Sequence, residues 1–121
     1  MQLIDPSAPE HSAALAKISD LAKWPHHCVM TRQAVEDIVK SKLTKEALLC
    51  AIRDHIASTQ PIYTLTQELT GMLAYVFLPC VVDGCSLYVK VQLPACLVEK
   101  DERLVVISAH PPKYAPPREK D

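Results

Sequence analysis

The spacing of apolar residues changes at Pro61, and this change narrows the folds that are open to the chain. Before Pro61, apolar residues recur at the three- to four-residue spacing of one helix face. After it, short runs rich in β-branched and aromatic residues follow, and "CSLYVKVQL" (85–93) alternates apolar and polar side chains at every step. The sequence therefore predicts an α+β domain in which three N-terminal helices pack on a four-stranded antiparallel sheet.

Capping residues predict where the first and third helices begin. Ser7 and Glu10 have the spacing of a capping box, so the first helix is expected over about residues 8–23. Thr44 is expected to be the N-cap of the third helix. The apolar face of that third helix is predicted to comprise Leu48, Leu49, Ile52 and Ile56.

The second helix is predicted from "MTRQAVEDIVKSK", which begins at Met30. Thr31 is a candidate N-cap, although the helix could also begin earlier, within His26–Met30. Val35, Ile38 and Val39 fall on one side of this helix. We expect that side to face the core.

Four strands are expected in the second half of the chain. Their predicted ranges are 61–69, 72–79, 85–93 and 103–110. The last strand should be central, because it is apolar on both faces, and it should stop at Pro111 and Pro112, which cannot donate ladder hydrogen bonds. Residues 1–114 are expected to form a single domain, followed by a flexible Pro-rich tail at 115–121.

Composition removes several classes of protein. The chain has 121 residues, a formal charge of −1 and only two glycines, Gly71 and Gly84. So few glycines exclude the Gly-rich phosphate loops of most nucleotide-dependent enzymes. The first residues lack the features of a signal peptide, and no apolar stretch approaches the roughly 18–20 residues that a membrane helix needs. We therefore expect a cytoplasmic protein with no membrane partner.

The cysteines fit the same compartment. Their number is odd, and they are Cys28, Cys50, Cys80, Cys85 and Cys96. Irregular spacing without a C-x-x-C pair predicts free thiols in a reducing cytosol. On the third helix, Cys50 is interpreted as a core thiol and His55 as a polar flank. The alternative is a zinc site built from His26, Cys28, Cys80 and Cys85.

Candidate catalytic residues lie on the polar side of the third predicted strand. Tyr88, Lys90 and Gln92 share that side. If the last strand pairs with it antiparallel, His110 lies near one end of this row and Arg103 at the other. Such side chains can supply a base for a ribose 2′-hydroxyl, a cation for the phosphate and an acid for the leaving oxygen, which is the chemistry of metal-independent RNA cleavage.

At these residues the sequence resembles a known family. Helices followed by "SLYVKVQL" and "RLVVISAHPPK" are similar to the RelE-like superfamily of type II toxin–antitoxin ribonucleases, and within it to the MqsR-type toxins, over roughly residues 25–113. The resemblance implies a RelE-like fold. It also implies an endoribonuclease that cleaves mRNA, including ribosome-associated mRNA, through a 2′,3′-cyclic phosphate. No metal and no cofactor are implied, and the cognate antitoxin protein is the expected inhibitor.

The resemblance assigns roles to individual residues. Tyr88 stands at the tyrosine of the family's "YLK" strand and Lys90 at its lysine, while His110 takes the place of the lysine in the closing "VSFK" strand; these three are the predicted catalytic residues. Arg103, Lys113 and Gln92 are expected to bind RNA. The chain departs from the family in lacking a counterpart of its first-strand lysine and second-strand glutamine, and in its acidic net charge.

Other interpretations remain open. Tyr88 and Lys90 could belong to an ordinary solvated face, and His110 could be a polar residue at a strand end. The chain could be a degenerate relative of the toxins, a non-enzymatic adaptor from a mobile or accessory gene that dimerises or binds a partner, or a small-molecule-binding domain. The enzyme interpretation requires Tyr88, Lys90, His110 and a further cation, Arg103 or Lys113, within about 10 Å of one another.

Overall fold

The computed structural model describes residues 1–66, 71–93 and 103–112. Along the chain, the elements are β1 (Gln2–Leu3), α1 (Pro9–Leu21), the 3₁₀ helix η1 (Pro25–His27), β2 (Cys28–Met30), α2 (Arg32–Lys40), α3 (Lys45–Ala57), β3 (Ile62–Thr66), β4 (Leu73–Val82), β5 (Cys85–Gln92) and β6 (Leu104–His110). This confirms the α+β class. In this part of the chain, no helix is both long and apolar enough to cross a membrane.

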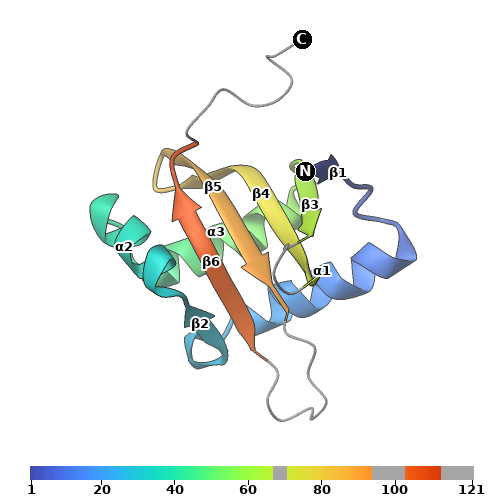
Figure 1. Cartoon of the computed structure of the whole chain (residues 1–121), viewed down its shortest axis with the longest axis horizontal. Helices are drawn as coiled ribbons and strands as arrows, with labels where there is room; N and C mark the ends of the chain where they lie inside the picture. Colours follow the sequence, from blue (N-terminus) through green and yellow to red (C-terminus); the bar gives the residue numbers. More distant parts are fainter. Residues whose placement is uncertain (67–70, 94–102, 113–121) are drawn as a thin grey trace.

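The sheet has six strands in the order β1-β3-β4-β5-β6-β2 (Figure 1). The predicted antiparallel meander of four strands forms its centre, from β3 to β6. The prediction of only four strands was wrong, because β1 pairs antiparallel with β3, and β2 pairs parallel with β6. Segment His26–Met30 therefore ends in a strand instead of starting a helix. Strands of two or three residues are too short to show alternation, so pairing with a neighbour decides their structure.

Strand β4 continues past its predicted end at Pro79. The register shifts between Phe77 and Cys80, and this irregularity accommodates a proline that cannot donate a ladder hydrogen bond. The β4–β5 hairpin then turns through Asp83 and Gly84, both with positive φ. Asp-Gly is a favoured pair for such a two-residue turn, because glycine tolerates this backbone conformation.

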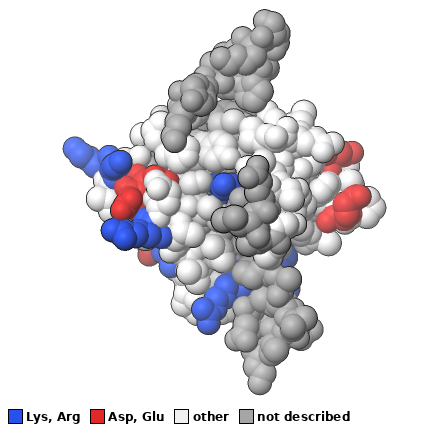
Figure 2. Space-filling model, viewed as in Figure 1, with Lys and Arg blue, Asp and Glu red and all other residues white. Residues whose placement is uncertain are grey.

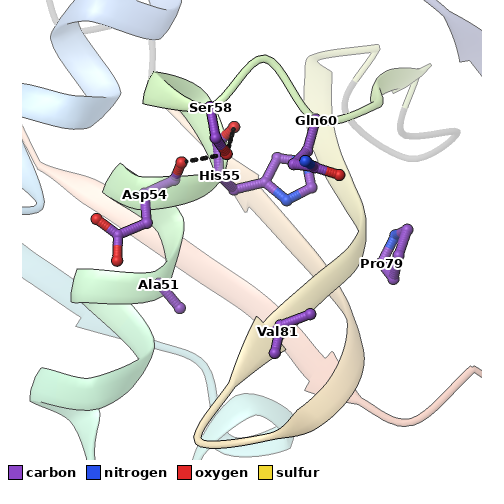
Figure 3. Close-up of a pocket in the computed structure, with 7 residues that line it drawn as sticks. All are labelled: Ala51, Asp54, His55, Ser58, Gln60, Pro79 and Val81. Carbon is purple, nitrogen blue, oxygen red and sulfur yellow. Dashed lines mark hydrogen bonds between the residues drawn. The ribbon is translucent and has the colours of Figure 1, made fainter.

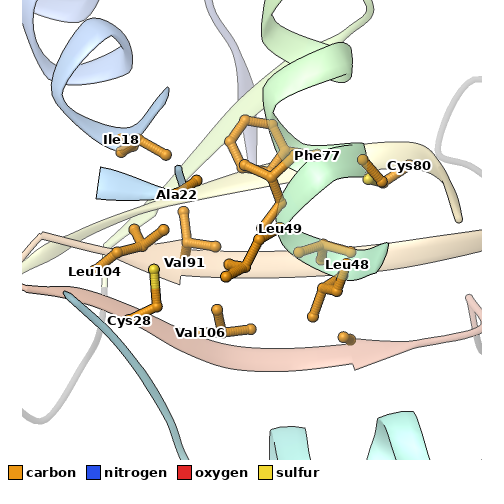
Figure 4. Packing of buried hydrophobic residues seen from close by; sticks show 14 of the residues in the cluster. Ile18, Ala22, Cys28, Leu48, Leu49, Phe77, Cys80, Val91, Leu104 and Val106 are labelled. Carbon is orange, nitrogen blue, oxygen red and sulfur yellow. The ribbon is translucent and has the colours of Figure 1, made fainter. Parts of the chain in front are cut away.

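Helices α1 and α3 cover one face of the sheet, behind the strands in Figure 1. Their apolar stripes meet the inward side chains of the central strands, and Figure 4 shows this core. Its fully buried members include Ile18, Leu48, Leu49, Ile52, Phe77, Leu87, Val89, Val91, Leu104 and Val106. The alternation of β5 thus places Leu87, Val89 and Val91 inward and leaves Tyr88, Lys90 and Gln92 on the opposite face.

The helix starts match the predictions in two of three cases. The side chains of Thr31 and Thr44 accept hydrogen bonds from Ala34 N and Ala47 N, as expected of N-caps. The predicted capping box at the first helix is absent. Helix α1 begins at Pro9, its N-cap makes no side-chain hydrogen bond, and the Ser7 hydroxyl donates instead to Asp5 Oδ1 at 2.7 Å.

Helix α2 lies beside β6, continuing where β2 ends (Figure 1). The Thr31 hydroxyl donates to Ile107 O at 2.7 Å, and Ala109 N donates to Asp37 Oδ2 at 2.9 Å. The buried side of α2 comprises Ala34, Asp37 and Ile38. Of the side predicted to face the core, only Ile38 is buried, whereas Val35 and Val39 are 45% and 68% exposed. Hydrogen bonds to the strand edge, not an apolar stripe, orient this helix.

Candidate functional site

Strands β5 and β6 bring the predicted catalytic residues together on the face away from α1 and α3. Tyr88 pairs directly with His110, and Lys90 with Ser108. The adjacency expected from antiparallel pairing is therefore confirmed. The side chains of Tyr88, Lys90 and His110 are half-buried, so each remains accessible from outside. We refer to these three residues as the β5–β6 row.

The rings of Tyr88 and His110 stack on each other. Their centroids are 5.2 Å apart and their planes differ by 13°. His110 Nδ1 lies 2.8 Å from Pro111 O. A carbonyl oxygen can only accept, so Nδ1 carries the hydrogen of this bond and Nε2 of the neutral ring keeps the lone pair. In this tautomer, Nε2 is the hydrogen-bond acceptor of the ring.

The other two members of the β5–β6 row differ in charge. Burial raises the pKa of the Tyr88 hydroxyl above its ordinary value of 10, so the phenol stays protonated at neutral pH. Lys90 of β5 pairs with Val76 of β4, which is fully buried. Among the described residues, Figure 2 shows few charged side chains near the centre of this face. The Lys90 side chain remains accessible, so its ammonium group can attract an anion to this face.

The predicted RNA-binding residues do not all join the β5–β6 row. Gln92 lies on the same side of β5, and its amide contacts Met72 Sδ at 3.0 Å. Arg103 is exposed at the start of β6, seven residues before His110, which corresponds to about 20 Å along an extended strand. Arg103 is thus too far away to share one phosphate with His110. Lys113 lies outside the described residues.

A second candidate site lies on the helix side of the sheet, between α3 and β4. It is a pocket of about 270 Å³ lined by Ala51, Asp54, His55, Ser58, Gln60, Pro79 and Val81 (Figure 3). The interpretation of residues on α3 was wrong here, because His55 is buried and Cys50 is exposed. Helical spacing could have separated them. His55 is three residues from Ile52 and seven from Leu48, which places it on the apolar face, whereas Cys50 is two residues from each and lies on the opposite side.

His55 is held by one strong hydrogen bond. Its Nε2 donates to Pro61 O at 2.7 Å, and its ring lies 5.2 Å from that of Phe77. Burial lowers the pKa of this imidazole below 6.5, and the bond to Pro61 opposes that effect in part. The residue is therefore mainly neutral at neutral pH, with Nδ1 as its remaining acceptor.

The cysteines do not support the zinc alternative. In the ranges described, His, Cys, Asp and Glu form no group of three or more that could hold a metal ion. Cys28 and Cys80 are buried free thiols, and Cys50 and Cys85 are exposed ones. Burial raises the pKa of Cys28, and raises that of Cys80 to about 12. Cys96 lies outside the described residues.

Comparisons of the chain with protein-family models, with curated proteins and with solved structures found no match.

Proposed function

We propose that the chain is a metal-independent endoribonuclease of the toxin type, or a degenerate relative of one, and that the β5–β6 row is its active site. The observation that supports this most is the direct pairing of Tyr88 with His110 one step from Lys90 on an accessible face. These residues supply a base, an acid and a cation, which are the three groups that RNA cleavage without a metal needs. The sequence resemblance assigns catalysis to the same three residues.

The hydrogen bond from His110 to Pro111 suggests which group is the base. Nε2 of His110 takes the proton of a ribose 2′-hydroxyl, and the resulting oxygen attacks the adjacent phosphorus. The bond from phosphorus to the 5′-oxygen breaks, leaving a 2′,3′-cyclic phosphate. Tyr88, whose raised pKa keeps its hydroxyl protonated, donates the proton to the leaving oxygen. The Lys90 ammonium stabilises the negative charge that develops on the phosphate.

This site differs from the one that the sequence suggested. Among the described residues, Lys90 is the cation beside the catalytic pair, since Arg103 lies at the other end of β6. One cation stabilises a phosphorane-like transition state less than two do. We therefore expect the chain to cleave RNA slowly. If it is a degenerate relative of the toxins, the missing second cation would also explain a loss of activity.

A protein-binding adaptor is the second candidate. It is favoured by Val35 and Val39, which are exposed on the outer side of α2 although both are large and apolar. In the toxin proposal, the same side of α2 is a candidate contact for the antitoxin or for a second copy of the chain. In the adaptor proposal, this contact is the function itself, and the β5–β6 row has no catalytic role.

The two proposals are separated by an RNA cleavage assay on purified protein in the presence of a metal chelator. The ribonuclease proposal expects fragments that end in a 2′,3′-cyclic phosphate, produced by the natural chain and not by His110→Gln. Growth arrest on induced expression, relieved by the neighbouring gene, would support the toxin assignment in the cytoplasm. Absence of cleavage on structured and unstructured RNA alike would reject catalysis and leave the adaptor.

A further inference from the structure

An exposed aromatic patch lies where α1 ends and β2 begins. Trp24, the only tryptophan of the chain, is 51% exposed. The ring of His26 lies 6.4 Å from that of Trp24 and 4.3 Å from that of His27. We call these three residues the Trp24 patch. Exposed tryptophan is uncommon on a surface without a binding role, because its large apolar area favours burial.

The backbone beneath the Trp24 patch is anchored at both ends to α3. Arg53 Nη1 donates to Ala22 O at 2.7 Å, and Lys45 Nζ donates to Cys28 O at 2.8 Å. Pro25 restricts the residue before it to extended conformations, and Trp24 accordingly has φ −122° and ψ 98°. A ligand that contacts these rings therefore meets a backbone that is already ordered, which reduces the entropy lost on binding.

Basic side chains lie next to the Trp24 patch. The parallel register pairs Cys28 with Leu104, so His27 and Arg103 are the residues that lead into two adjacent strands. Arg103 is exposed, and so is Lys23, which is 3.9 Å from Asp20. Figure 2 shows basic side chains near the lower end of β6. Aromatic rings for stacking beside cations for phosphates form the combination that binds single-stranded nucleic acid.

We propose that the Trp24 patch and Arg103 bind single-stranded RNA, with a base stacked on Trp24 and a phosphate bound by Arg103. This inference rests on the proposed ribonuclease function and specifies its substrate. Arg103 lies about 20 Å from His110 along β6, so one RNA strand that reaches both residues must span several nucleotides. The bases must also be unpaired, because a base in a duplex cannot stack on a side chain. The substrate is therefore an unstructured stretch of RNA rather than a duplex or a mononucleotide.

The fluorescence of Trp24 can be used to measure the proposed contact with an RNA base. The full chain is titrated with an unstructured RNA of about ten nucleotides whose 2′-hydroxyls are methylated, so that it cannot be cleaved. Stacking of a base on the single tryptophan should quench its fluorescence. With labelled RNA, Trp24→Ala should weaken binding by about tenfold or more, whereas Trp24→Phe should keep most of the affinity because an aromatic ring remains.

Salt dependence tests the phosphate contact. Arg103→Ala should reduce the slope of log affinity against log salt by about 0.7, the value for one contact to a single strand. Arg32→Ala is the matched control, since it removes an arginine whose side chain is 94% exposed on α2 and which is not part of the proposed contact. Its slope should equal that of the natural chain. Equal slopes for all three proteins would overturn the role of Arg103.

The outcomes separate this inference from the ribonuclease proposal. Quenching by RNA in a protein that cleaves no RNA supports the Trp24 patch and rejects catalysis. Cleavage by the natural chain with an unchanged KM in Trp24→Ala, and no quenching, rejects the patch and keeps catalysis. A duplex that quenches Trp24 as strongly as the single strand would overturn the proposed substrate.

Discussion

Two histidines on opposite sides of the sheet make the same kind of hydrogen bond and are exposed to different surroundings. His55 of α3 donates to Pro61 O and is 4% exposed, whereas His110 at the end of β6 donates to Pro111 O and is half-buried. The bond fixes the tautomer of each ring. The two histidines differ in burial. Burial lowers the pKa of His55 and makes that residue part of the core. The covered side of the sheet uses histidine for structure, and the open side leaves it available for proton transfer.

The largest expected contrast between the two sides concerns thiols. Cys80 on the covered side is buried, with a pKa of about 12, while Cys85 at the hairpin is exposed. In native protein, a thiol reagent should modify Cys50 and Cys85 at least about 10³-fold faster than Cys28 and Cys80, since buried thiols react only through opening of the fold. Peptide mapping after timed labelling measures each rate. Equally fast labelling of Cys80 and Cys85 would show that the helix side is open.

The next largest effect concerns His110. His110→Ala and His110→Gln should both lower RNA cleavage by about 10²-fold or more, the usual size of a general-base contribution. Glutamine can still donate to Pro111 O but cannot take a proton, so it is the matched control for the hydrogen bond. Thermal melting should show a stability change within about 1 kcal/mol. If either variant unfolds while activity per folded molecule is constant, His110 is structural, as His55 is.

Tyr88→Phe should have a smaller effect, about tenfold on cleavage, with no change in melting temperature, because only a hydroxyl is removed. The raised pKa of Tyr88 adds a pH criterion. The phenol donates a proton only while it is protonated, so activity at alkaline pH should decline above the ordinary tyrosine value of 10, not below it. The phenylalanine variant should lose this alkaline decline. An identical pH profile for both proteins would exclude Tyr88 as the acid.

The smallest effect concerns the pH dependence of stability through His55. Its folded-state pKa is below the unfolded value of 6.5, so between these two values the unfolded chain binds more protons. The contribution is complete above pH 6.5 and is lost as the pH falls toward the folded value. One group cannot contribute more than about 1.4 kcal/mol per pH unit. Denaturant titrations from pH 5 to 8 measure the free energy of unfolding at each pH. This free energy should change less with pH in His55→Gln than in His110→Gln. An equal pH dependence in both variants would contradict the comparison.

The central part of the fold was predictable because its pattern is local. Alternation over 85–93 predicted β5 (Cys85–Gln92), and two prolines marked the end of β6 (Leu104–His110). The pairing of Tyr88 with His110 then follows from antiparallel geometry alone. Their stacked rings and the bond to Pro111 O do not, because they depend on side-chain torsions that no periodicity encodes.

Failures of prediction occurred where distant contacts decide the structure. Helix α2 turns Asp37 inward because that carboxylate accepts from a strand 72 residues later, which outweighs the apolar preference of Val35 and Val39. Strand β2 exists because β6 offers a partner for Cys28–Met30. The burial of His55 and the exposure of Cys50 are different, because helical spacing from Leu48 and Ile52 was enough to predict both. For α2 and β2, the sequence contains the residues concerned but does not indicate which distant segment will pair with them.

The side-chain bonds from α2 to β6 also determine how another molecule could approach the sheet. Beyond the three residues of β2, the outer edge of β6 presents Ile107 O and Ala109 N, and Thr31 and Asp37 occupy both. An edge whose backbone groups are occupied cannot template an additional strand from a second chain. Strand addition along β6, the common first step of edge-to-edge aggregation and of inhibition by an inserted peptide, is therefore blocked at the level of the backbone. If the ribonuclease proposal holds, we expect an inhibiting partner to cover the open face of the β5–β6 row instead of adding a strand to β6.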